Sequence, residues 1–175
     1  MPTPPAHDLD HYLQLYDQLT EDFIDTFAGF TKVAYNTPIA EGKWSPGGYV
    51  EHVIKSERAF GRILHGPMAP APAGRGADDL CARLDADLRE TRTNLTAPAS
   101  VTPYEGARYA AAEQLAAFVD GRADVRAAAQ FAPDAGAVAK AYAHFLFGEM
   151  TVTEWVYFQA LHGERHRLQV AAARR

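Results

Sequence analysis

The sequence contains one cysteine, Cys81, so no disulfide can form within the chain. It also has no apolar run long enough to cross a bilayer. The opening residues 1–5, rich in proline, do not resemble the charged and then apolar segments of a signal peptide. We therefore expect neither a disulfide-stapled scaffold nor a membrane protein, and we predict a cytoplasmic location.

Positive charge is scarce as well. Lys and Arg number 17 against 22 Asp and Glu, which gives a formal net charge of −5. Nucleic-acid binding depends on clustered cations that neutralise phosphates, so we do not expect a DNA-binding module or any nucleic-acid partner. The arginines near the C-terminus are interpreted as structural, because cations complement the negative end of a helix dipole: Arg165, Arg167, Arg174 and Arg175.

With 175 residues, of which 47% are hydrophobic and 22% charged, the chain has the composition of an ordinary globular protein. This length predicts a single domain over residues 1–175. Cys81 stands between Leu80 and Leu84 in a predicted amphipathic helix, which favours a packed small residue over a nucleophile.

Apolar residues recur every three or four positions in several segments, which predicts amphipathic helices. The expected helices cover residues 9–30, 46–65, 78–95, 108–131 and a last one from about residue 151. Ser45 is the N-cap of the second helix with Pro46 at its first position, and residues 151–154 match a capping box. No window shows sustained strand alternation, so the predicted fold class is all-α, and residues 135–143 receive no assignment.

The predicted last helix carries His162 and His166, four residues apart. A helix places side chains at this spacing on one face, where both imidazoles can reach one ion. They share an inward band with Gln159, and buried imidazoles need polar partners. Taken alone, the pair is also typical of polar residues near a helix C-terminus. Gly163 between them leaves room for a close neighbour.

A third histidine, His52, lies on the shoulder of the apolar stripe of the second helix. Taken singly, it is typical of a satisfied histidine at the core boundary. The three histidines together would form a ligand set that leaves coordination positions open, as catalytic sites do.

The order of these motifs resembles that of the DinB-like superfamily of small bacterial helical metalloproteins. The matching features are Trp44-Ser45-Pro46 before the second helix, His52 within it, and the pair His162 and His166 in the last helix. The segment from His144 to Trp155 is also similar to the one that precedes the last helix of the family. The resemblance covers about residues 9–170.

This resemblance implies a four-helix bundle with up-down-down-up topology, here with a short extra helix or loops, and a homodimer. It also implies that His52, His162 and His166 bind a divalent metal, commonly zinc or nickel. Relatives include transferases and isomerases that use a low-molecular-weight thiol, so such a thiol is the cosubstrate that the resemblance suggests.

Two classes of function remain open. The first is a metal-dependent enzyme, a thiol-dependent S-transferase or a hydrolase, that acts on a small-molecule substrate. The second is a non-catalytic, stress-associated metal-binding bundle, which a fourth protein ligand such as His144 would favour.

Other polar residues complete the predicted site. Tyr49 and Gln159 are the expected substrate-binding residues. Glu57, near the centre of an apolar stripe, would either orient a ligand histidine or pair with an arginine. Glu51 and Glu164 are expected on solvated faces, and no general base is assigned.

Overall fold

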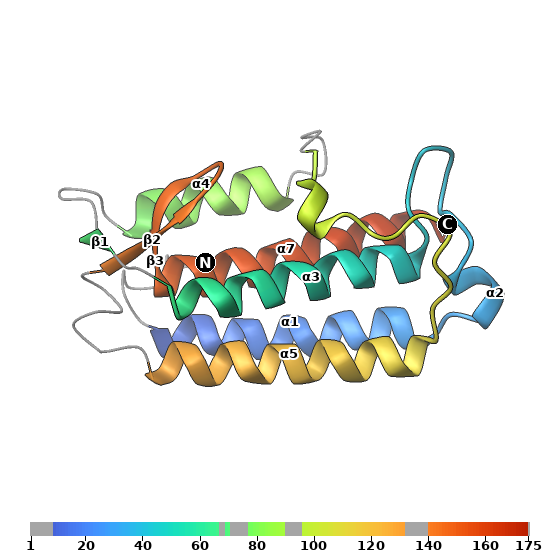
Figure 1. The fold of residues 1–175 in the computed structure, drawn as a ribbon, viewed down its shortest axis with the longest axis horizontal. Helices are drawn as coiled ribbons and strands as arrows, with labels where there is room; N and C mark the ends of the chain where they lie inside the picture. Colours follow the sequence, from blue (N-terminus) through green and yellow to red (C-terminus); the bar gives the residue numbers. More distant parts are fainter. Residues whose placement is uncertain (1–8, 67–68, 71–76, 90–95, 132–139, 175) are drawn as a thin grey trace.

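Four long helices lie side by side in the computed structural model, which describes residues 9–66, 69–70, 77–89, 96–131 and 140–174 (Figure 1). They are α1 (Leu9–Ala28), α3 (Pro46–Leu64), α5 (Ala111–Phe131) and α7 (Val152–Ala172). Both α1 and α3 pack against α5 and α7. The sequence colours in Figure 1 show that α1 and α7 run in one direction and α3 and α5 in the other.

The helices begin and end near the predicted positions. Ser45 caps α3 by accepting a hydrogen bond from the backbone of Gly48 at 3.1 Å. Thr151 and Glu154 form the expected capping box of α7. The first helix ends at Ala28, two residues before the predicted end, and α5 begins at Ala111 rather than residue 108.

Three shorter elements complete the helical part: α2 (Lys32–Tyr35), α4 (Ala77–Arg89) and the 3-10 helix η1 (Ala99–Val101). The predicted third helix corresponds to α4, while residues 90–95 lie outside the described residues. The side chain of Cys81 lies outside them too, so its packing stays a prediction. Since α4 packs against α7, it adds a further layer beside the long helices.

The structure is mostly helical, which is broadly consistent with the predicted all-α class, but it also includes a small three-stranded antiparallel sheet that the sequence analysis did not predict. Its strands are β1 (Ala69–Pro70), β2 (Lys140–His144) and β3 (Gly148–Thr151), in the order β1-β2-β3. The strand β1 has only two residues, and in β3 two exposed residues are followed by two buried ones, so neither shows the alternation that identifies a strand in sequence. Gly148 has a φ of 74°, a conformation that glycine adopts without strain at the β2–β3 turn.

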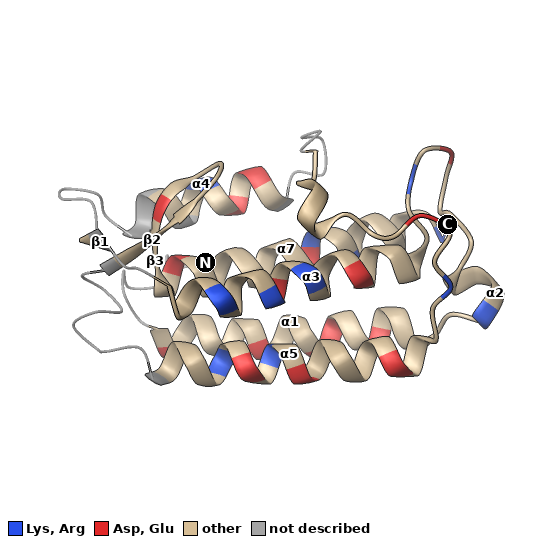
Figure 2. Ribbon diagram, viewed as in Figure 1, with Lys and Arg blue, Asp and Glu red and all other residues tan. Residues whose placement is uncertain are grey.

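The core follows the predicted apolar stripes. In α1 the buried side chains recur at helical spacing: Tyr12, Leu13, Tyr16, Leu19, Phe23 and Phe27. Charged side chains of both signs are interspersed along α3 and α5 (Figure 2), and Arg126 of α5 pairs with Asp17 of α1 at 3.0 Å. In the part of the chain that the structure describes, no helix is long and apolar enough to span a membrane.

Candidate metal centre

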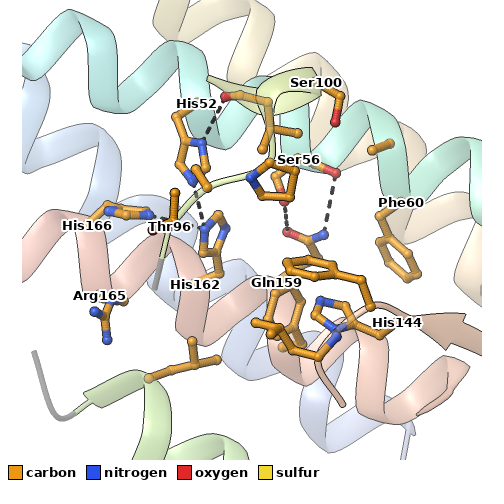
Figure 3. Close-up of a pocket in the computed structure, with 18 of the residues that line it drawn as sticks. His52, Ser56, Phe60, Thr96, Ser100, His144, Gln159, His162, Arg165 and His166 are labelled. Carbon is orange, nitrogen blue, oxygen red and sulfur yellow. Dashed lines mark hydrogen bonds between the residues drawn. The ribbon is translucent and has the colours of Figure 1, made fainter. Parts of the chain in front are cut away.

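The three predicted ligands come together between α3 and α7. These neighbouring helices run in opposite directions, so His52 of α3 meets His162 and His166 of α7 (Figure 3). The Nε2 atom of His162 lies 3.0 Å from Nε2 of His52 and 3.1 Å from Nε2 of His166. The ring of His162 meets those of His52 and His166 edge to face, at interplanar angles of 70° and 82°. The short distances show that the Nε2 atom of each ring faces the same centre.

This spacing fits a divalent metal. Imidazole nitrogens bind zinc at about 2.0–2.1 Å, and two ligands of one ion are then roughly 2.9–3.4 Å apart for tetrahedral or octahedral angles. The two distances from His162, 3.0 and 3.1 Å, lie within that interval, and the three ligand atoms all lie within 4.8 Å of one another. Three nitrogens are too few to saturate the ion, so positions would remain for water or another small ligand.

The outer nitrogens of two rings define their protonation. Nδ1 of His52 lies 2.9 Å from the carbonyl oxygen of Val101, and Nδ1 of His166 lies 2.8 Å from Oε1 of Gln169. Since both oxygens are acceptors, each Nδ1 carries the proton and donates it. The Nε2 atoms of His52 and His166 therefore both present lone pairs toward His162.

One proton on His162 Nε2 cannot serve both lone pairs in full, whereas a cation at the centre would bind the lone pairs of all three Nε2 atoms. The remaining nitrogen of His162, Nδ1, is buried and has no hydrogen-bond partner among the described residues. The cluster is thus electrostatically incomplete as a purely protein assembly.

Burial keeps these imidazoles neutral, as metal ligands must be. It lowers the pKa of His166 to about 3 and lowers the pKa of His52 and His162 as well. The neighbouring histidines reinforce the effect on His162 and His166, because a second positive charge in the same site would be repelled.

The histidines lie at one end of a cavity of about 620 Å³. Helix α3 lines it at successive turns with Tyr49, His52, Ser56 and Phe60, and α7 lines it with Trp155, Gln159, His162 and His166. The residues 96–101 and the β2–β3 turn also contribute to its walls. The volume is that of a small-molecule site.

Both predicted substrate-binding residues line this cavity. Tyr49 packs its ring against His166 at 5.3 Å between centroids. Gln159 is buried, and its Oε1 accepts a hydrogen bond from the hydroxyl of Ser56 at 3.3 Å (Figure 3). These contacts hold both side chains in place on the wall beside the histidines.

Glu57 pairs with an arginine, which was one of its two predicted roles. Its carboxylate pairs with Arg122 at 2.9 Å and accepts a hydrogen bond from the hydroxyl of Tyr16 at 2.8 Å. Arg122 also donates to the carbonyl oxygen of Gln159 at 3.0 Å. A Cβ atom on Gly163 would lie only 2.7 Å from Nη2 of Arg122, so the close neighbour of this glycine is the arginine.

The two other glutamates do not lie on freely solvated faces. Glu51 accepts hydrogen bonds from the backbone of Tyr104 at 3.0 Å and from the hydroxyl of Tyr109 at 2.5 Å. Glu164 is buried and pairs with Arg167 at 2.6 Å. Both carboxylates are thereby engaged by neighbouring side chains, and neither lines the described cavity.

His144 does not belong to the three-histidine cluster, in the part of the chain that is described. Its ring contacts Phe158, which in turn stacks on His162, so an aromatic side chain contacts both histidines. Figure 3 shows His144 on the far side of Gln159 from His162. The structure therefore offers no support for His144 as a closing fourth ligand.

Sequence reasoning missed several residues of the cavity wall, among them Val101 and Gln169, which hold two of the histidine rings, and also Arg165 and Ser56. Arg165 was interpreted as a partner of the helix dipole, yet it is buried, lines the cavity and donates to the backbone of Asp87 at 3.2 Å. Ser56 follows His52 by one helical turn, and that spacing was the signal that could have identified it.

The fold and the site define a mostly helical protein with a three-histidine cluster that could hold a metal ion. The family model of the DinB superfamily matches residues 15–170, and the chain belongs to this superfamily. Searches of curated proteins and of solved structures found no match.

Proposed function

We propose that the protein is a divalent-metal-dependent enzyme in which His52, His162 and His166 hold the ion. The observation that carries the proposal is the convergence of three neutral imidazole nitrogens, 3.0 and 3.1 Å apart, on the wall of a cavity. Zinc or nickel is the proposed metal, because both are bound well by imidazole. The reaction is a thiol-dependent S-transfer or a hydrolysis of a small molecule.

A bound ion would lower the pKa of a thiol or a water at an open position and so supply a nucleophile near neutral pH. The protein contributes the surroundings. Val101 and Gln169 fix the orientation of two ligand rings through their Nδ1 atoms. Tyr49 and Gln159 would bind the substrate from the adjoining wall.

A single domain with the up-down-down-up bundle topology is the architecture that we propose, supported by the helix directions in Figure 1. The family resemblance further suggests a homodimer. The alternative function is a non-catalytic metal-binding protein. The open cavity favours the enzyme, because a purely structural ion is usually closed off by a fourth protein ligand.

Metal analysis of untagged protein tests the ligand assignment. We expect wild-type protein to bind one zinc or nickel ion per chain. The variant His166→Ala should lose more than about 100-fold in metal affinity, because loss of a ligand costs more than the roughly 10- to 100-fold that loss of a ligand's hydrogen-bond partner costs. His65→Ala is the control, because His65 is exposed at the end of α3. Equal metal binding by wild type and His166→Ala would refute the assignment.

Activity separates the two functions. Low-molecular-weight thiols are offered with chlorodinitrobenzene as electrophile, so that a carbon–sulfur bond forms and chloride leaves. Transfer that requires the metal and is lost in His166→Ala supports the enzyme. Tight metal binding without transfer or hydrolysis favours the non-catalytic alternative.

A further inference from the structure

The end of the cavity away from the histidine cluster is built around His144. Its ring packs among Phe145, Phe147, Trp155 and Phe158, with centroid distances of 4.7–5.0 Å. Phe60 extends this wall by stacking on Trp155 at 5.0 Å. All six side chains line the cavity. The polar ring of His144 is thus buried among aromatic side chains, of which Phe145 is itself exposed to solvent.

The turn between β2 and β3 fixes the tautomer of this ring. Nδ1 of His144 accepts hydrogen bonds from the backbone N–H groups of Leu146 at 3.1 Å and Phe147 at 3.3 Å. A proton on Nδ1 would face two donors, so the neutral ring carries its proton on Nε2. Burial keeps this ring neutral, because it lowers the pKa of His144 to about 4.

The Nε2–H group of His144 is therefore a donor, and the hydrogen bonds that this ring makes to the described residues both involve Nδ1. A neutral imidazole that donates from such a position binds and polarises a carbonyl without carrying a charge. Since His144 lines the cavity and its Nε2–H is not engaged by the described residues, this donor is available to a ligand there.

The surroundings of His144 favour an uncharged ligand group. Among the described residues, the cations that line the cavity are Lys43 and Arg165, which neighbour Trp44 and His166 in the chain and belong to the opposite end. Figure 3 shows Arg165 on the side of His166 and His144 on the other side. Arg83 lies over the Phe147 ring at 5.3 Å but does not line the cavity, so a carboxylate bound here would have no cation beside it within the cavity and would be costly, whereas a hydrogen-bonded carbonyl would not.

We propose that the His144 end of the cavity is a subsite for an apolar, uncharged substrate group with a hydrogen-bond acceptor such as a carbonyl, which Nε2–H of His144 binds. This inference rests on the proposed function, because the bound group would be part of the substrate that reacts at the histidine cluster. Phe158 contacts both His144 at 4.7 Å and His162 at 5.5 Å between ring centroids, so the two ends are close enough for one small molecule to reach both.

Binding of acetophenone and ethylbenzene tests the subsite, because the two probes have similar shape and differ in the carbonyl. The ratio of their dissociation constants is compared between wild type and His144→Phe, which keeps an aromatic ring and removes the donor. We expect the preference for acetophenone to fall by about 3- to 10-fold in the variant, which is the net effect of one hydrogen bond. An unchanged ratio would overturn the proposal.

A measurement on wild-type protein avoids dependence on the folding of the variant. Proton–nitrogen correlation spectra of the histidine rings should show His144 protonated on Nε2, with an Nε2 shift on addition of acetophenone and a smaller one with ethylbenzene. Protonation on Nδ1, or equal shifts with both probes, would contradict the assignment.

Both measurements are made on metal-loaded and on chelator-treated protein. Discrimination between the probes that persists without metal supports His144 as the donor. Discrimination seen only with metal places the carbonyl on the ion and refutes the subsite. A protein that binds no metal but still discriminates would refute the proposed function alone, so the two failures are distinguishable.

Discussion

Two buried polar clusters contact the same stretch of α7 and are satisfied in opposite ways. Glu57, Arg122 and Tyr16 pair a carboxylate with a guanidinium and a hydroxyl, so their charges balance within the protein. The guanidinium also lies 4.0 Å from the centre of the Tyr16 ring. In the histidine cluster, by contrast, lone pairs converge, and no side chain outside the cluster pairs with them among the described residues.

This difference in charge pairing indicates which cluster stabilises the fold and which one is suited to bind a ligand. In the Glu57–Arg122 cluster the opposite charges neutralise each other and hold α3 and α5 together, although Nε and Nη1 of Arg122 have no hydrogen-bond partner among the described residues. A cluster that leaves like groups facing one another is stable only if a cation or a proton joins it. The cavity adjoins the second kind of cluster, where an exchangeable ligand has access to it.

The largest effect is expected from breaking the balanced cluster. Arg122→Met leaves the Glu57 carboxylate buried without its cation, and we expect the free energy of unfolding to fall by about 3–5 kcal/mol. Burial already raises the pKa of Glu57 while Arg122 opposes this, so loss of the arginine should raise that pKa further. Urea unfolding of the metal-free protein measures the change.

The double variant with Glu57→Gln is the control for this prediction. It removes both charges and keeps an acceptor for Tyr16, so it should recover much of the lost stability. Stability losses that simply add in the double variant would show that the two charges are not coupled.

The contrast between the clusters also explains what the sequence could predict. The spacing of His162 and His166, with His52 in a helix that Ser45 and Pro46 begin, depends on helix geometry, and local patterns identify it. Apolar periodicity likewise predicted the long helices. Both signals come from residues close in the chain.

Features that depend on contacts between residues far apart in the chain could not be predicted from the sequence. The sheet joins β1 to β2 across some seventy residues, and neither β1 nor β3 shows the alternation of a strand. The sequence could not identify Arg122 as the partner of Glu57, because the pair depends on the packing of α5 against α3. Arg165 was misread because the direction of its side chain depends on how α4 packs against α7.

A smaller effect is expected where the two clusters meet, at Gly163. An alanine there would place Cβ 2.7 Å from Nη2 of Arg122, whose guanidinium is held by Glu57 and by the backbone of Gln159. We expect Gly163→Ala to cost about 1–3 kcal/mol in the free energy of unfolding, as overpacking does.

Gly121→Ala is the matched control for this helical glycine. Nothing lies within 4 Å of the added methyl group at that position in α5, so the change should stabilise the protein by up to about 1 kcal/mol. Thermal or urea unfolding compares the two. Equal effects of the two alanines would mean that the contact with Arg122 is not restrictive.

The smallest effect concerns the outer support of the histidine cluster. Gln169 accepts the Nδ1 proton of His166 and so keeps Nε2 as the free ligand atom. Gln169→Ala should lower metal affinity by about 10-fold, a tenth or less of the loss in His166→Ala, because the ring can still turn to the ion. Competition with a metal-binding dye measures it, with Gln14→Ala, an exposed glutamine of α1, as the control. Unchanged affinity in Gln169→Ala would mean that packing against Tyr49 and the other histidines already holds the His166 ring, and the hydrogen bond would then have no part in setting the ligand atom.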